Sequence, residues 1–132
     1  MRNVLIIDDE FVICEVLSRI FVSENYSVRT GHTIEEGLQL CLQERPDILL
    51  LDVNLPDGSG LDLCSRLKAD PRLKRIPVII LTGSTTEEEG RAAGLESGAD
   101  NYAAKPFVVE DIVEMVKDLV GRSFEFRGPQ PV

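Results

Sequence analysis

Several features are absent from this 132-residue sequence, and each absence excludes a class of protein. No apolar run approaches the roughly 20 residues needed to cross a bilayer, so no membrane-spanning helix is predicted. The cysteines are odd in number and show no CxxC spacing, which argues against a metal site or catalysis and predicts buried thiols in a reducing cytoplasm: Cys14, Cys41 and Cys64. Bases are scarce, with 14 against 23 acids, and the net charge of −9 repels nucleic acid and anionic lipid. Neither partner is therefore expected to bind this domain.

The sequence does contain a regular alternation of strand-like and helix-like segments. The predicted strands are residues 3–8, 26–30, 47–52, 77–82 and 100–103, and the predicted helices are 12–23, 34–43, 60–69, 86–97 and 110–120. Such alternation implies right-handed βαβ units and a parallel sheet. The first, third and fourth strands are the most apolar, so they are expected at the centre of the sheet. The predicted fold class is α/β, a doubly wound five-stranded parallel sheet with helices on both faces.

The length of the chain is that of one ordinary domain. Residues 1–121 are expected to form this domain. Residues 122–132 contain Gly128, Pro129 and Pro131, and are expected to be a C-terminal tail or the start of a linker.

Polar and charged residues follow four of the predicted strands. These groups are Asp8-Asp9-Glu10, Asp52-Val53-Asn54, Thr82-Gly83-Ser84 and Ala104-Lys105-Pro106. In an open parallel sheet they meet at one edge, where ligands bind. Two carboxylates 4 Å apart repel by about 4 kcal/mol at an effective dielectric constant of 20, so three ionised acids need a cation. Oxygen ligands at short spacing suit Mg²⁺, and the sequence therefore predicts a magnesium site.

A magnesium site of this kind usually brings a phosphate with it. A carboxylate beside the metal can attack phosphorus and form an aspartyl phosphate. Asp52 is the predicted nucleophile because it is the lone acid of the central strand, whereas Asp8 and Asp9 form a pair that holds the metal. The metal, Lys105 and the Thr82 hydroxyl would supply the positioning and the charge neutralisation that the phosphoryl oxygens need.

Four segments in this order carry a resemblance to a known family. They are VLIIDDE at the first strand, ILLLDVNLPDGSGLDL around Asp52, PVIILTGS around Thr82 and GADNYAAKPF through Lys105. Over about residues 2–121 the chain resembles the receiver domain of two-component and phosphorelay response regulators. The resemblance implies a flavodoxin-like sheet of order 2-1-3-4-5.

The resemblance also implies roles for single residues. Asp52 would accept the phosphoryl group. Asp9, Asp52 and the main-chain carbonyl of Asn54 would bind Mg²⁺, with Mn²⁺ as a substitute, and Asp8 would act through water. Lys105 would pair with the phosphate, and its bond to Pro106 would be cis.

Further residues would carry the switch and set the lifetime of the phosphate. Thr82 would turn inward to the phosphoryl group, and Tyr102 would follow it from an exposed to a buried position. Asn54 and Ser84 would flank the path of an attacking water. His32 is expected to be an ordinary surface residue. The fourth helix contains Gly90 and Gly94, each costing about 1 kcal/mol relative to alanine, so it is expected to be the weak element of the switch.

The implied function is that of a cytoplasmic signalling module rather than a turnover enzyme. A sensor histidine kinase or phosphotransfer protein would donate the phosphoryl group, and the face of the fourth helix, fifth strand and fifth helix would control a downstream protein or a linked output domain. The resemblance leaves a phosphorylation-dependent homodimer open.

Three alternatives from other classes stay open on the residues alone. A Mg²⁺-dependent phosphohydrolase working through an aspartyl phosphate would want an acid where Asn54 stands, and a cap for which no insertion is long enough. A flavin-type binder would want a phosphate loop where the chain has three acids. An unphosphorylated interaction module would not need the acid pair, Asp52, Thr82 and Lys105.

Overall fold

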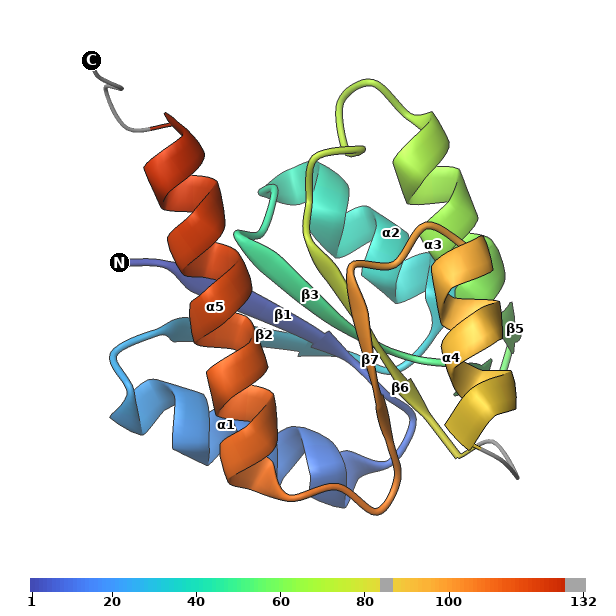
Figure 1. The fold of residues 1–132 in the computed structure, drawn as a ribbon, viewed down its shortest axis with the longest axis horizontal. Helices are drawn as coiled ribbons and strands as arrows, with labels where there is room; N and C mark the ends of the chain where they lie inside the picture. The colour runs from blue at the N-terminus through green and yellow to red at the C-terminus, as the bar shows by residue number, and fades with distance from the viewer. Residues whose placement is uncertain (84–86, 128–132) are drawn as a thin grey trace.

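The computed structural model describes residues 1–83 and 87–127, and the side chains of residues 1–83 and 92–121. Its centre is a five-stranded parallel sheet of order β2-β1-β3-β6-β7 (Figure 1). These strands are β1 (Asn3–Ile7), β2 (Ser27–Gly31), β3 (Ile48–Asp52), β6 (Val78–Thr82) and β7 (Asn101–Ala104). Counted along the chain, the order of the five strands is 2-1-3-4-5, which confirms the predicted fold class.

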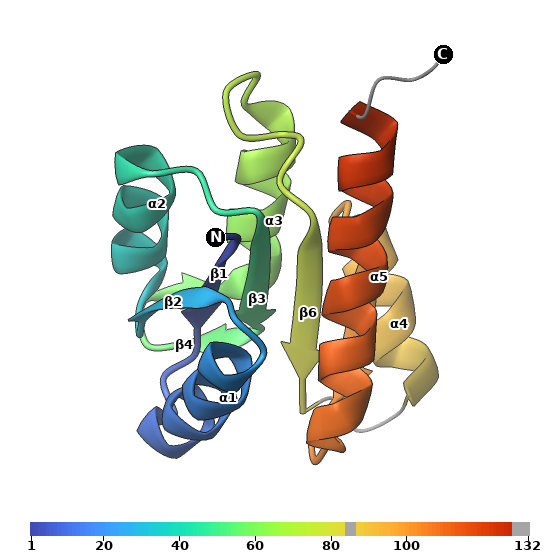
Figure 2. The same ribbon diagram turned by 90° about the vertical axis from the view of Figure 1, so that its left-hand side faces the viewer.

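Helices cover both faces of this sheet (Figures 1 and 2). Helices α1 (Phe11–Ser23) and α5 (Val109–Arg127) pack on one face, and α2 (Ile34–Gln43) and α3 (Gly60–Ala69) pack on the other. Helix α4 (Glu87–Glu96) contacts the edge strand β7. With both faces covered, the central strands bury every side chain, which explains why β1, β3 and β6 read as unbroken apolar runs.

The core has two halves because successive strand residues point to opposite faces. In β1, Val4 and Ile6 pack with Leu17 and Phe21 of α1. The alternate residues of the same strand pack with α2 and α3. Cys14, Cys41 and Cys64 are buried free thiols in these two halves, as predicted.

Most of the predicted element bounds agree with the structure to within one residue, and two differences stand out. The first is the end of α5, which runs through Arg127 instead of ending at 120. Gly121 is a weak helix former but does not end a helix by itself, and the next Gly-Pro pair begins only at residue 128. The domain boundary at residue 121 stays a prediction.

The second difference is a small antiparallel hairpin that was not predicted. It consists of β4 (Asn54–Leu55) and β5 (Gly58–Ser59), directly after Asp52. Strands of two residues are too short to show a periodic pattern, and only the Pro56-Asp57-Gly58 turn signal marks the hairpin in the sequence.

Candidate functional site

Two acids lie side by side at the carboxyl end of the sheet. The register of β1 with β3 pairs Ile7 with Leu51, so Asp8 and Asp52 follow at the same level on neighbouring strands. Asp8 has no exposed surface, and Asp52 is 3% exposed. Parallel strands end at a common edge, and this geometry buries two carboxylates next to each other.

A single ammonium group lies between these carboxylates. The backbone N–H of Lys105 donates to the carbonyl of Thr82 at 2.7 Å, which places the lysine directly after β7. Its Nζ lies 2.9 Å from Asp8 Oδ2, 3.3 Å from Asp52 Oδ1 and 2.8 Å from Glu10 Oε2. Of these three ion pairs, the one with Glu10 has the geometry of a hydrogen bond. The peptide bond between Lys105 and Pro106 is cis.

The surroundings of Asp52 hold its pKa above the ordinary range of an aspartate. Burial and the neighbouring Asp8 charge raise the pKa of Asp52 to about 6, against the opposing attraction of Lys105. For Lys105, burial lowers the pKa, but the hydrogen bond with Glu10 and the charges of Asp8 and Asp52 outweigh burial and raise it. At neutral pH the Asp52 carboxylate is therefore mostly ionised and the Lys105 ammonium beside it is charged.

The acids of the β1–α1 loop fit a hard metal ion. Ligand oxygens of Asp8, Asp9 and Glu10 lie within 4.8 Å of one another. Asp8 Oδ1 accepts a hydrogen bond from the Glu10 N–H at 2.9 Å, whereas the buried Oδ2 has no hydrogen-bond partner besides its ion pair with Lys105. An all-oxygen donor set with an unsatisfied buried oxygen suits Mg²⁺. Asp52 does not belong to this trio but shares the Lys105 ammonium with Asp8.

The remaining predicted site residues are placed as follows. Thr82 ends β6 beside β3 and is 5% exposed. Tyr102 lies on β7, is half-buried, and its Cβ lies 3.7 Å from the position that a Cβ on Gly94 of α4 would occupy. Asn54 is exposed and pairs with Ser59 in the hairpin. Ser84 lies outside the described residues.

The segment that follows Asp52 returns tightly onto it. The Gly60 N–H donates to the Val53 carbonyl at 2.7 Å, and a Cβ at Gly60 would collide with the Asp52 carbonyl oxygen. Only glycine fits at this close approach. In the same segment Asp57 accepts hydrogen bonds from the backbone N–H groups of Ile34 and Glu35, at 2.8 and 3.1 Å, and so caps α2.

Sequence reasoning missed Asp57 and misplaced His32. The ring of His32 is half-buried, its Nδ1–H donates to the Asp8 carbonyl at 2.9 Å, and the ring packs edge-on against Phe11. His32 thus fixes the backbone of the acid pair and is not an ordinary surface residue. Its position directly after β2, the neighbour of β1, is the signal that points to the site edge.

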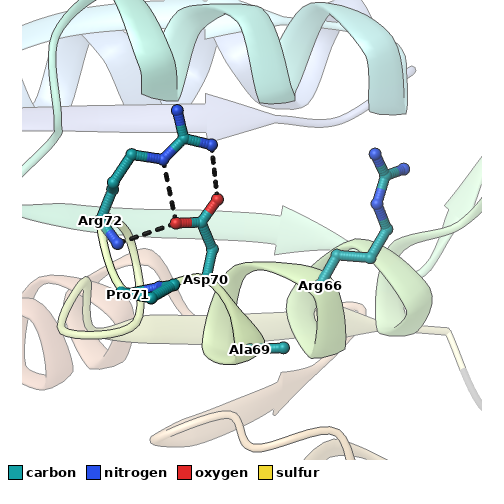
Figure 3. A pocket seen from close by; sticks show the side chains of 5 residues that line it. All are labelled: Arg66, Ala69, Asp70, Pro71 and Arg72. Carbon is teal, nitrogen blue, oxygen red and sulfur yellow. Dashed lines mark hydrogen bonds and ion pairs between the residues drawn. The ribbon is translucent and has the colours of Figure 1, made fainter.

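A separate hollow lies at the other end of α3 and holds no comparable chemistry (Figure 3). Arg66, Ala69, Asp70, Pro71 and Arg72 line it. Asp70 accepts from the side chain of Arg72 at 2.7 and 3.1 Å and from its backbone N–H at 2.8 Å, while Arg66 makes none of these contacts. Of the three charged side chains that line it, Asp70 and Arg72 pair with each other, so the hollow lacks the cluster of acids that makes the cleft the candidate site.

Comparison with known proteins agrees with this fold. The family model described as "Response regulator receiver domain" matches residues 4–117. The chain belongs to the response-regulator receiver family. Its receiver domain is 36% identical, over 121 residues, to the probable transcriptional regulatory protein TcrX of Mycobacterium tuberculosis and 35% identical to the response regulator MprA of Mycobacterium avium. The match covers 92% of this chain, and 50% and 52% of those relatives.

Solved structures agree with the assignment. A putative response regulator from Chloroflexus aurantiacus is 36% identical, with a TM-score of 0.86, over 92% of this chain and 98% of that one. The receiver domain of a signal transduction histidine kinase from Syntrophus aciditrophicus is 28% identical, with a TM-score of 0.87, over 100% and 97% of the two chains. Receiver domains are signalling modules of two-component systems, and the alternatives from other classes are not favoured.

The receiver domain spans about half the length of the two regulators named above. Across the described residues, no helix is both long and apolar enough to span a membrane.

Proposed function

We propose that this receiver domain accepts a phosphoryl group on Asp52 from a histidine kinase or a phosphotransfer protein. The observation that carries the proposal is the cleft at the carboxyl end of the sheet, where buried Asp8 and Asp52 on neighbouring strands meet the Lys105 ammonium. Asp52 is the nucleophile in this proposal because it is the lone acid at the end of the central strand β3 and lies buried beside Lys105, whereas Asp8 and Asp9 form the pair that holds the metal. With a pKa of about 6 it is mostly ionised at pH 7.5, the form that attacks phosphorus.

Phosphoryl transfer depends mainly on positioning and on neutralising the equatorial oxygens. Lys105 can supply one positive charge, and the Thr82 hydroxyl at the end of β6 can donate a hydrogen bond. Asp9, Asp52 and the main-chain carbonyl of Asn54 would hold Mg²⁺ or Mn²⁺, with Asp8 acting through water. The metal, when bound, supplies further positive charge against the carboxylates and the phosphoryl oxygens.

The phosphorylated state would be transmitted through the face made of α4, β7 and α5. Thr82 would turn toward the phosphoryl group, and Tyr102 would move inward beside α4, which it already borders near Gly94. Asn54 and Ser84 would flank the water that hydrolyses the acyl phosphate. A two-state element biased by a local charge change is the usual form of such a switch.

The partners follow from this mechanism. A cytoplasmic sensor kinase or phosphotransfer protein would supply the phosphoryl group, and a downstream protein or a covalently linked output domain would respond. A phosphorylation-dependent homodimer through the switch face would be one form of that response. The relatives' greater length supports a linked output domain, since about half of each lies outside the match.

The test is intact mass after incubation with acetyl phosphate and Mg²⁺. Wild type is expected to gain one phosphoryl group. Hydroxylamine should remove this group, and EDTA should prevent its addition. Asp52→Asn should gain none, while Asp62→Asn, an exposed acid in the first turn of α3, should behave as wild type. Full labelling of Asp52→Asn would refute the proposal.

A further inference from the structure

The Lys105 ammonium is shared among three carboxylates, and its directional hydrogen bond goes to Glu10 rather than to Asp52. The Nζ–Oε2 distance to Glu10 is 2.8 Å, against 3.3 Å to Asp52 Oδ1. An ammonium group has three N–H donors, and a donor that is aimed at one acceptor is not available to another. One of the N–H groups that a phosphoryl group on Asp52 could use is therefore already engaged.

Glu10 has no other structural task that would explain this contact. It stands at the N-cap of α1, but its side chain makes no capping hydrogen bond. The backbone of Glu10 is held independently, by the bond from its N–H to Asp8 Oδ1. The side chain is 56% exposed, and within the described residues Lys105 is the partner of its carboxylate. Glu10 can therefore release the lysine by turning into solvent, at little cost to the fold.

We propose that Glu10 is a positioning residue that holds Lys105 in the unphosphorylated protein and competes with the phosphoryl group for it. This inference rests on the proposed function. When an Asp52 oxygen attacks the phosphorus of acetyl phosphate, the P–O bond to acetate breaks, and acetate leaves with the electron pair. The new phosphoryl oxygens then take the N–H group that Glu10 held, and Glu10 turns away.

The competition has a defined consequence for the rate. Removing the carboxylate frees one N–H group of Lys105 and removes a negative charge near the incoming phosphoryl dianion. Asp8 and Asp52 still hold the lysine in the cleft, since both of their ion pairs remain. Glu10→Gln should therefore be phosphorylated faster than wild type, by about two- to fivefold, the range expected for a half-exposed ion pair.

A competing explanation is that Glu10 binds the metal, because its oxygen belongs to the acid trio. The two roles give opposite results. As a metal ligand, Glu10 would be needed for Mg²⁺ binding, and Glu10→Gln would be phosphorylated more slowly. As the residue that holds Lys105, it would contribute only a nearby charge, so Glu10→Gln would lower the Mg²⁺ affinity by less than about tenfold.

The experiment compares Glu10→Gln with Glu15→Gln, which makes the same charge change on α1 at an exposed residue paired with Arg19. Three quantities are measured: the initial rate of phosphorylation by acetyl phosphate with saturating Mg²⁺, the Mg²⁺ dissociation constant by calorimetry without a phosphoryl donor, and the NMR chemical shift of Lys105 Nζ in EDTA. Glu10→Gln should raise the rate, keep the Mg²⁺ affinity within about tenfold of wild type and shift the Lys105 resonance. Glu15→Gln should change none of the three.

A double-mutant cycle shows whether the effect passes through Lys105. In a Lys105→Met background, Glu10→Gln should lose its acceleration. Equal acceleration in both backgrounds would mean simple charge repulsion and would overturn the inference. A loss of Mg²⁺ affinity of more than about tenfold, or an unshifted Lys105 resonance, would overturn it as well. If Glu10→Gln is phosphorylated at the wild-type rate, this inference alone is refuted. If wild type takes up no phosphoryl group, the proposed function is refuted as well.

Discussion

The two ends of the central sheet use the same kinds of charged side chain in opposite ways. At the amino end, Lys68 Nζ donates to the Ile76 carbonyl at 2.7 Å and pairs with Asp100, whose Oδ2 accepts from the Val78 N–H at 2.8 Å. At the carboxyl end, Asp8 and Asp52 face each other across one ammonium group, and Asp8 Oδ2 has no hydrogen bond.

The difference separates charges that stabilise the fold from charges that serve the site. Charged groups at the amino end satisfy backbone N–H and C=O groups that would otherwise be buried without a partner, which is a stabilising use. Acids at the carboxyl end raise each other's energy, and a bound cation would relieve this repulsion. Removing a charged side chain should therefore raise the free energy of unfolding when the side chain lies at the carboxyl end, and lower it when the side chain lies at the amino end.

The largest expected effect is at the carboxyl end. Asp52→Asn should increase the free energy of unfolding at pH 7.5 in EDTA by up to about 3 kcal/mol, because the pKa of Asp52 is raised from 3.8 to about 6 by burial and by Asp8. Urea unfolding followed by circular dichroism measures the change. Asp62→Asn, on the surface of α3, is the control and should have little effect.

The same pKa shift predicts a pH dependence with a definite sign. Between about pH 4 and 6 the folded protein binds the Asp52 proton and the unfolded chain does not, so wild-type stability falls relative to Asp52→Asn as pH rises through this window. The difference in the free energy of unfolding between wild type and Asp52→Asn should reach its full size above pH 6 and should vanish near pH 4. A gap that is constant across this range, or a wild type more stable than the variant at pH 7.5, would contradict the comparison.

A smaller effect of opposite sign is expected at the amino end. Asp100→Ala leaves the fully buried Val78 N–H without its acceptor and Lys68 without its acid, and should lower the free energy of unfolding by about 2 kcal/mol. Glu15→Ala, which breaks an exposed pair on α1, should cost less than about 0.5 kcal/mol. Equal losses in the two variants would show that the amino-end network is not stabilising.

The smallest effect is expected at Gly83, next to Thr82. A Cβ at Gly83 would meet no atom within 4 Å of it in the described part of the chain, so Gly83→Ala should change stability by less than about 0.5 kcal/mol and leave the Mg²⁺ affinity unchanged. Gly60→Ala is the contrast, because its Cβ would collide with the Asp52 carbonyl oxygen. Thermal unfolding of both variants would show whether the carboxyl end is tightly packed only behind Asp52.

The sequence pattern was enough to predict a parallel sheet with β1, β3 and β6 at its centre and the meeting of Asp8, Asp52 and Lys105, whereas the strand order came from the resemblance to receiver domains. Apolar runs marked the central strands, and the carboxyl ends of parallel strands must coincide, so residues far apart in the chain could be placed at one edge. The contacts of single side chains could not be predicted in this way. Glu10 pairs with a lysine 95 residues later, and Asp57 caps a helix that starts 23 residues earlier, and neither contact leaves a periodic signal.

The cap that Asp57 places on α2 links two parts of the domain mechanically. Asp57 belongs to the turn that follows Asn54, and its carboxylate holds the backbone of Ile34 and Glu35. A ligand that pulls this turn inward must either bring the first turn of α2 with it or break both hydrogen bonds. Movement beside Asp52 would then be transmitted to α2, on the opposite face of the sheet from α1 and α5.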